Sequence, residues 1–172
     1  MTAKLKHCLL VVDDELNVCE SVHDLLRREF RVLWAQSARD GYRILQEEDV
    51  HIVMSDQRMP EISGVELLTQ IKSRNPQAIR MLFTGFTDLD SVVAAINQGQ
   101  IYRFLKKPWQ PEELEAAVRL AAQEYDRLTE LTEERRRLIT SVEDLRARVE
   151  CLETEIRRLA GHAGPNLDGP SA

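Results

Sequence analysis

The stretch from Glu112 to Ala160 contains neither glycine nor proline, although the chain of 172 residues holds 7 Gly and 6 Pro elsewhere. Nearly half of the residues in this stretch are charged, and Pro111 directly before it suits the first position of a helix. At 1.5 Å per residue such a helix extends about 74 Å, whereas the remaining N-terminal domain has a radius of gyration of about 14 Å. We therefore predict a globular part and then a long helix that extends beyond it.

The composition fits a folded protein, since 43% of the residues are apolar, 30% are charged and the net charge is -6. No apolar run approaches the roughly 18–20 residues of a membrane span, and the acidic balance gives no general reason to expect nucleic-acid binding. Cys8, Cys19 and Cys151 lack metal or redox spacing, and the four histidines lack ligand spacing. We expect a cytoplasmic protein with buried or inert thiols.

Short apolar runs alternate with segments of helical periodicity before Pro111. The predicted strands are residues 8–12, 30–34, 52–54, 79–83 and 101–105. The predicted helices are residues 16–28, 38–47, 65–74 and, after the N-cap candidate Asp88, 89–99. Ser37 is the predicted N-cap of the second helix. This alternation predicts an α/β fold with right-handed crossovers and a parallel sheet that carries helices on both faces. Ligand sites in such sheets lie at the carboxyl ends of the strands.

Residues that can carry chemistry lie at the ends of four of the predicted strands, and they are Asp13 with Asp14, Asp56, Thr84 with Gly85, and Lys107. Three carboxylates close together need a cation, and ligation by oxygen alone suits Mg²⁺. Asp56 on the central strand is the best placed nucleophile and can form an aspartyl phosphate. The metal and the Lys107 ammonium then neutralise charge on the transferring phosphoryl group, and Thr84 can donate a hydrogen bond to it.

These residues resemble the receiver domain of response regulators in two-component signalling. The resemblance covers roughly residues 6–125, and the motifs that carry it are VVDDE at 11–15, SDQRMP at 55–60 with Gly64, TG at 84–85 and KP at 107–108. It implies a five-stranded, doubly wound, flavodoxin-like sheet with strand order 2-1-3-4-5.

The resemblance also implies a role for each matching residue. Asp56 accepts a phosphoryl group from a sensor histidine kinase or a phosphotransfer protein. Mg²⁺ is held by Asp13, Asp14, Asp56 and the backbone carbonyl of Arg58. The phosphoryl group is contacted by Thr84, Gly85 and Lys107, the last of these before a cis Pro108. Thr84 and Phe104 form the conformational switch. No enzymatic activity is expected beyond phosphotransfer to Asp56 and its autodephosphorylation.

Other interpretations explain single residues but not the set. An acidic pair after a strand is more often a turn or a helix cap, and one central aspartate proves little. Haloacid-dehalogenase-type phosphatases also form aspartyl phosphates, but they place two acids as D-x-D after the first strand. Here Asp13 and Asp14 are adjacent, and the nucleophile candidate Asp56 lies on another strand. A kinase is excluded because the sequence has no ATP-binding motif.

The long helix carries a heptad pattern from Leu128 onward. Its predicted dimer seam consists of Leu128, Leu131, Leu138, Val142, Leu145, Val149, Leu152, Ile156 and Leu159. Leucine at every d position and β-branched residues at later a positions favour a parallel two-stranded coiled coil, and Arg135 is the polar a position. We predict a receiver at residues 1–125, a homodimeric coiled coil at 126–160 and a flexible tail at 161–172.

Two downstream roles fit a receiver joined to a long helix. The tail after Gly161 has no folded module, which favours a stand-alone signalling adaptor that acts by binding another protein. The alternative is the regulatory front end of a larger transcription activator or cyclic-dinucleotide phosphodiesterase, because residues 99–109 resemble receivers that precede such domains. The downstream target does not follow from the sequence.

Overall fold

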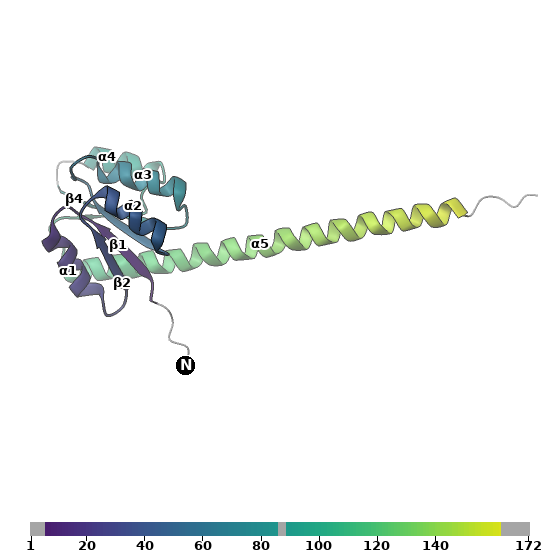
Figure 1. Cartoon of the computed structure of the whole chain (residues 1–172), viewed down its shortest axis with the longest axis horizontal. Coiled ribbons are helices and arrows are strands. Elements are labelled where there is room, and N and C mark those ends of the chain that lie inside the picture. Colours follow the sequence, from purple (N-terminus) through teal and green to yellow (C-terminus); the bar gives the residue numbers. More distant parts are fainter. Residues whose placement is uncertain (1–5, 86–88, 163–172) are drawn as a thin grey trace, which may run out of the picture. The chain divides into compact units, whose positions relative to one another are not determined.

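The computed structural model describes residues 6–85 and 89–162. The elements of the chain, in order, are β1 (Cys8–Val12), α1 (Leu16–Leu26), β2 (Arg31–Ala35), α2 (Ala38–Glu47), β3 (Ile52–Asp56), α3 (Gly64–Arg74), β4 (Ile79–Thr84), α4 (Leu89–Asn97), β5 (Arg103–Lys106) and α5 (Pro111–His162). Strands and helices alternate along the chain until α5, the longest helix (Figure 1).

All five strands are parallel and lie in the order β2-β1-β3-β4-β5. This order confirms the predicted doubly wound, flavodoxin-like fold. Every residue of β1 and β3 is buried, as expected for central strands covered on both faces, whereas the edge strand β2 mixes buried and exposed positions. The topology therefore places the ends of β1 and β3 side by side at the middle of the sheet.

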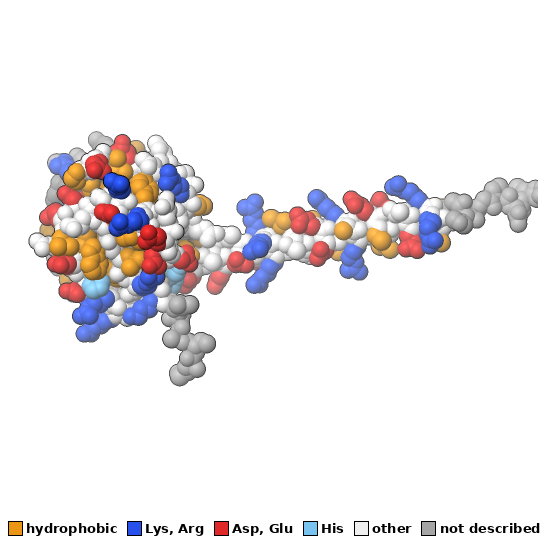
Figure 2. Space-filling view, viewed as in Figure 1, with side chains coloured by type: hydrophobic (Ala, Val, Ile, Leu, Met, Phe, Trp, Pro, Cys, Tyr) orange, Lys and Arg blue, Asp and Glu red, His pale blue; other side chains and the backbone are white. Residues whose placement is uncertain are grey.

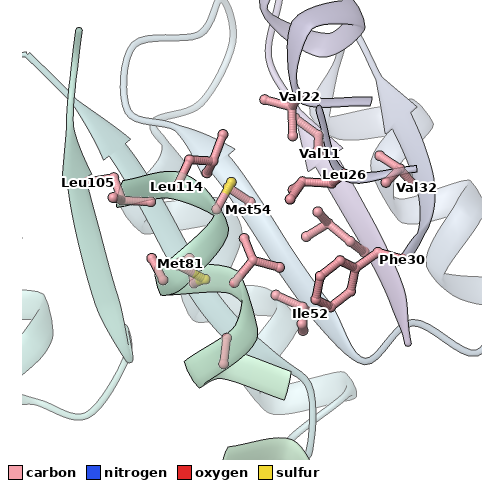
Figure 3. Packing of buried hydrophobic residues seen from close by; sticks show 14 of the residues in the cluster. Val11, Val22, Leu26, Phe30, Val32, Ile52, Met54, Met81, Leu105 and Leu114 are labelled. Atoms are coloured by element: carbon pink, nitrogen blue, oxygen red, sulfur yellow. The ribbon is translucent and has the colours of Figure 1, made fainter. Parts of the chain in front are cut away.

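Two apolar clusters form the core, one on each face of the sheet. Alternate residues of a strand point to opposite faces, so Leu9 and Val11 join one cluster while Leu10 and Val12 join the other. The first cluster lies under α1 and α5, and Figure 3 shows Leu26 and Leu114 packing there against strand residues that include Met54 and Met81. The second cluster contains residues from α2, α3 and α4, among them Leu45, Leu68 and Ala95.

Most predicted element boundaries agree with the structure within two residues. The Ser37 side chain accepts a hydrogen bond from the Asp40 backbone N–H, which confirms the predicted cap of α2. The fifth strand was predicted from residue 101, but β5 begins at Arg103, because Ile101 is buried outside the strand pairing. The predicted N-cap of the fourth helix, at residue 88, lies outside the described residues.

Helix α5 runs from Pro111 to His162, slightly past the predicted end near Ala160. The chain divides into two compact units between Thr129 and Glu130. From Glu130 to Ala160 every residue is exposed, and we call this segment the stalk. The tail predicted at residues 161–172 lies outside the described residues from 163 onward.

The stalk carries exposed apolar side chains among charged ones (Figure 2). Between 48% and 65% of the surface is exposed for Leu131, Leu138, Ile139, Val142, Leu145, Val149, Leu152, Ile156 and Leu159. All of these except Ile139 belong to the predicted seam. Leu128 differs from the rest of that seam, because it is half-buried and packs against the core cluster under α1 and α5. The exposed apolar series therefore begins at Leu131.

Two further findings concern membrane-spanning helices and cysteines. Within residues 6–85 and 89–162, no helix combines the length and the apolar composition needed to cross a membrane. All three cysteines are free thiols: Cys8 and Cys19 are buried and Cys151 is exposed. Burial raises the pKa of the Cys19 thiol to about 11, so this thiol is uncharged and unreactive near neutral pH.

Candidate functional site

The carboxyl ends of β1, β3, β4 and β5 bring the predicted chemical residues to one edge of the sheet. Asp13 comes directly after β1, Asp56 is the last residue of β3, and Thr84 is the last residue of β4. Lys107 comes directly after β5, and its backbone N–H donates to the Thr84 carbonyl. Four residues that are far apart in the sequence thus belong to one site.

Lys107 links two of the carboxylates. Its Nζ lies 2.8 Å from Asp13 Oδ2 and 2.5 Å from Asp56 Oδ1. The Asp13 side chain is fully buried and 11% of the Asp56 side chain is exposed, so both charges are largely shielded from water. Charge-assisted hydrogen bonds of this kind hold all three side chains in defined positions.

The other oxygens of both carboxylates accept backbone hydrogen bonds. Asp13 Oδ1 accepts from the Glu15 N–H at 2.9 Å, and Asp56 Oδ2 accepts from the Arg58 N–H at 2.5 Å. These bonds fix the rotation of each carboxylate, so that one oxygen faces the backbone and the other faces Lys107. Asp56 therefore presents an oriented oxygen next to a cation, which is what a carboxylate nucleophile for phosphorus requires.

Burial and ion pairing have opposite effects on the pKa values of Asp13 and Lys107. Burial raises the pKa of Asp13 above its ordinary value, although the hydrogen bonds from Lys107 and Glu15 act in the opposite direction. For Lys107, burial lowers the pKa, but the hydrogen bonds and charges of Asp13 and Asp56 outweigh it and hold the net pKa above the ordinary value. Lys107 thus stays charged throughout the physiological pH range.

The arrangement fits a divalent cation only in part. Asp13 Oδ2 and Asp56 Oδ1 converge on a single cationic nitrogen, and carboxylate oxygens are the donors that Mg²⁺ prefers. Asp14 is exposed and does not join them. Across the part of the chain that the structure describes, no three His, Cys, Asp or Glu side chains are grouped as donors for one metal ion. The structure thus brings two of the three predicted acidic ligands together.

The predicted switch residues lie on the neighbouring strands. Thr84 is fully buried, and its Oγ1 donates to the Gly85 carbonyl at 3.0 Å. Phe104 is half-buried against the core cluster that includes α3 and α4, whereas 39% of Tyr102 is exposed. Thr84 therefore has a backbone partner that it can exchange for another acceptor, but the switch roles of Thr84 and Phe104 stay predictions.

Three features of the site were not predicted from the sequence. The Trp109 ring stacks on Phe83 with centroids 4.3 Å apart, and Lys107 Nζ lies 5.6 and 5.9 Å from the centroids of Phe83 and Trp109. Gln57 is buried, and its Oε1 accepts the Val65 N–H, which ties α3 to the end of β3. The third is a capping box at α3.

That capping box consists of Ser63 and Glu66, each accepting a backbone N–H of the other. The predicted start of this helix, residue 65, is one residue too late, because the S-x-x-E signature places the first helical residue at Gly64. The cis peptide bond between Lys107 and Pro108, implied by the resemblance, is present.

Gly64 occupies a position that admits no side chain. A Cβ atom there would lie 2.1 Å from the Asp56 carbonyl oxygen and 2.7 Å from Leu82 Cδ1. We expect Gly64→Ala to lower the free energy of unfolding by about 2–3 kcal/mol, because α3 must shift away from β3. Gly85→Ala is the control, since nothing lies within 4 Å of its Cβ position. Urea unfolding measures both variants, and equal midpoints for the two would contradict the steric argument.

The family model described as "Response regulator receiver domain" matches residues 9–119. The chain belongs to this family. The matched region includes all five strands apart from Cys8, the first residue of β1, and it contains Asp13, Asp14, Asp56, Thr84 and Lys107.

The curated relatives are longer than this chain. The chain is 39% identical over 125 residues to the hydrogenase transcriptional regulatory protein HoxA of Bradyrhizobium diazoefficiens, covering 73% of this chain and 26% of that protein. It is 34% identical over 119 residues to the transcriptional regulatory protein GlrR of Escherichia coli, covering 69% and 26% respectively. The chain thus spans about a quarter of the length of the curated relatives that it matches.

Solved structures share the fold. The signal receiver domain of an HD domain-containing protein from Pseudomonas fluorescens superposes with a TM-score of 0.70 at 31% identity, covering 76% of this chain and 96% of that chain. A structure named adenylate cyclase from Rhodopirellula baltica gives a TM-score of 0.73 at 29% identity, covering 75% and 96%. Similar receivers thus occur in proteins with different names.

Proposed function

We propose that the receiver accepts a phosphoryl group on Asp56 from a histidine kinase or a phosphotransfer protein. The observation that carries this proposal is the position of Asp56, whose carboxylate is oriented by a backbone N–H on one side and by the Lys107 ammonium on the other. A bare carboxylate with this support is a competent nucleophile.

In the proposed transfer, an Asp56 oxygen forms a bond to phosphorus while the bond from phosphorus to the donor's imidazole nitrogen breaks. The electron pair of the broken bond stays on that nitrogen. Lys107 neutralises negative charge on the phosphoryl oxygens, and Thr84 and the Gly85 backbone provide further polar contacts. Mg²⁺, when held by Asp13, Asp14, Asp56 and the Arg58 carbonyl, supplies electrostatic stabilisation of the same charge.

The experiment that tests this proposal uses a small-molecule donor. We expect the purified chain to gain the mass of one phosphoryl group when it is incubated with acetyl phosphate and Mg²⁺. The modification should be labile to hydroxylamine, map to Asp56 and fail to form when EDTA is present from the start. Asp56→Asn should gain nothing. Incorporation at another residue, or the same rate in EDTA, contradicts the proposal.

We further infer that the stalk pairs with a second copy of the chain as a parallel coiled coil. The support is the series of half-exposed apolar residues from Leu131 to Leu159 at heptad spacing. In a parallel pair, Arg148 at a g position lies beside Glu153 at an e position of the partner helix. This adds charge complementarity, although such exposed pairs contribute little energy.

The output candidates differ in the module that the receiver controls. The stand-alone adaptor is the simpler function for a receiver joined to a stalk. The front end of a transcription activator is favoured by the names of the curated relatives, which are transcriptional regulatory proteins. In both cases we propose action in the cytoplasm, where free thiols such as Cys151 stay reduced. Partners recovered with phosphorylated wild type and with Asp56→Asn distinguish a promoter-bound complex from a protein adaptor.

A further inference from the structure

A second polar cluster lies at the edge of the sheet opposite the carboxylates. It consists of His7, His51, Tyr125 and Asp126, and we call it the base clamp. His7 directly precedes β1 and His51 directly precedes β3, while Tyr125 and Asp126 lie on α5. The clamp thus joins the starts of the two central strands to the helix that continues into the stalk.

The contacts within the clamp are close and cross long distances in the sequence. His7 Nε2 lies 2.8 Å from Asp126 Oδ1, and 17% of the His7 side chain is exposed. The His51 ring stacks on Tyr125, with centroids 4.5 Å apart and an interplanar angle of 18°. His7 meets both rings edge-on, at 5.4 Å from His51 and 6.0 Å from Tyr125. Aromatic contacts of these geometries are favourable beyond the burial of their area.

Hydrogen bonding fixes the two imidazole rings. A carboxylate only accepts at neutral pH, so His7 Nε2 carries the proton that it donates to Asp126. His51 Nδ1 accepts the Cys8 backbone N–H at 3.2 Å, so this nitrogen is bare. The other nitrogen, His51 Nε2, lies 3.5 Å from Asp49 Oδ2. Asp126 therefore holds the His7 ring, and the Cys8 backbone holds the His51 ring. Tyr125 stacks on a His51 ring whose orientation is already fixed.

The clamp is among the last contacts that α5 makes within its compact unit, together with the packing of Leu128 against the core. Tyr125, Asp126, Leu128 and Thr129 are half-buried, whereas every residue from Glu130 to Ala160 is exposed. The clamp also shares its two strands with the candidate phosphorylation site. β1 connects His7 to Asp13, and β3 connects His51 to Asp56. Each strand spans only about 17 Å, and both are buried throughout.

We propose that the base clamp is a positioning device that holds the end of α5 to the starts of β1 and β3, so that a change at Asp13 and Asp56 reaches the stalk through these strands. Without the clamp, α5 loses its contacts to the starts of the two strands, so we expect its backbone hydrogen bonds at residues 126–129 to open more often. The relay part of the proposal rests on the proposed phosphorylation of Asp56, whereas the holding part does not.

Hydrogen exchange tests the holding part. We expect amides of residues 126–129 to exchange at least about tenfold faster in Asp126→Asn and in Tyr125→Leu than in wild type, while β1 and β3 stay protected. Tyr125→Phe keeps the ring and should behave like wild type. Asp24→Asn is the matched control, because Asp24 pairs with His23 at 3.4 Å on α1, away from the clamp. Unchanged exchange in both clamp variants overturns the proposal.

The relay part uses the same peptides with and without acetyl phosphate and Mg²⁺. In wild type and Asp24→Asn, phosphorylation should change the exchange of residues 126–135 by about threefold or more. In the clamp variants this response should vanish, although mass spectrometry shows the same phosphoryl incorporation. A response that persists in Tyr125→Leu refutes the relay. If wild type incorporates no phosphoryl group, the proposed function fails, and the basal exchange still decides whether the clamp holds α5.

Discussion

Asp13→Asn should make the receiver more stable while lowering its Mg²⁺-dependent phosphorylation at least about 100-fold. The two effects have one cause, which is that a fully buried carboxylate is placed where a cation is needed. Proteins commonly give up stability at such functional positions. The two readouts are therefore expected to move in opposite directions.

The sign of the stability change depends on the pKa of Asp13. Burial raises this pKa above the ordinary value, so the folded state disfavours the ionised form. For such a group the favourable contribution is present at low pH and is lost as the pH rises through the folded pKa. At pH 7 the ionised Asp13 therefore destabilises the fold, and we expect its replacement to add roughly 1 kcal/mol to the free energy of unfolding.

Denaturant titrations in EDTA at several pH values measure this effect. The gain in the free energy of unfolding of Asp13→Asn over wild type should be largest at pH 7. It should shrink at lower pH, where the Asp13 carboxyl group becomes protonated. Asp14→Asn, which neutralises the exposed neighbour, should stay within about 0.5 kcal/mol of wild type. A lower stability of Asp13→Asn at pH 7 would show that the ion pair with Lys107 outweighs the cost of burial.

The rate of phosphorylation gives the second readout. Asparagine keeps the size of the Asp13 side chain but removes the charge that attracts the metal. The exposed Glu15 is the matched control, since Glu15→Gln makes the same change two positions away and should keep the wild-type rate. Equal Mg²⁺ dependence in wild type and Asp13→Asn would show that Asp13 is not a metal ligand.

The sequence predicts this site well because its geometry is set by topology. Parallel strands deliver their carboxyl ends to one edge, so polar residues after short apolar runs must converge there. Asp13, Asp56 and Thr84 are placed by this rule alone. The bridging position of Lys107 also depends on side-chain conformation, which no spacing encodes. The exposure of Asp14 is a similar detail, because a residue can come directly after the right strand and still be exposed while its neighbour Asp13 is buried.

The features that sequence reasoning missed differ in kind. The capping box of Ser63 and Glu66 has a local signature, because S-x-x-E at a helix start can be recognised in the sequence. The base clamp has no local signature, because His7 and Asp126 are separated by 119 positions. The spacing of histidines along a sequence indicates metal sites and not contacts of this kind. Leu128 fits the heptad and also the amphipathic face of the receiver helix. Only the fold shows that it packs against the core.

The heptad that begins beyond Leu128 leads to the second large effect. Replacing Leu145 and Leu152 together by aspartate should convert the proposed dimer to a monomer. Both leucines occupy d positions, and more than half of each side chain is exposed in the single chain. Pairing at the seam buries them, at about 1.5 kcal/mol each. Four leucines per dimer then contribute about 6 kcal/mol, which corresponds to a weakening of roughly 10⁴-fold in the dissociation constant.

Sedimentation equilibrium at micromolar concentration distinguishes the two states. Ala147→Asp with Thr154→Asp is the matched control, because it adds the same two charges at f positions of the same helix, away from the seam. This control should stay dimeric, and all three proteins should retain the receiver's urea transition. A wild-type monomer, or loss of the dimer in both double variants, contradicts a leucine seam.

The direction of pairing has its own measurement. In a parallel coiled coil that is in register, identical d positions of the two helices face each other. Leu145→Cys in a Cys151→Ser background should therefore form an interchain disulfide under mild oxidation, since Cys8 and Cys19 are buried. Ala147→Cys in the same background points away from the seam and should stay reduced. Equal oxidation of both variants would show random collision, whereas no disulfide from a dimeric Leu145→Cys protein would indicate an antiparallel pair. Parallel pairing would attach the two receivers to the same end of the paired stalks.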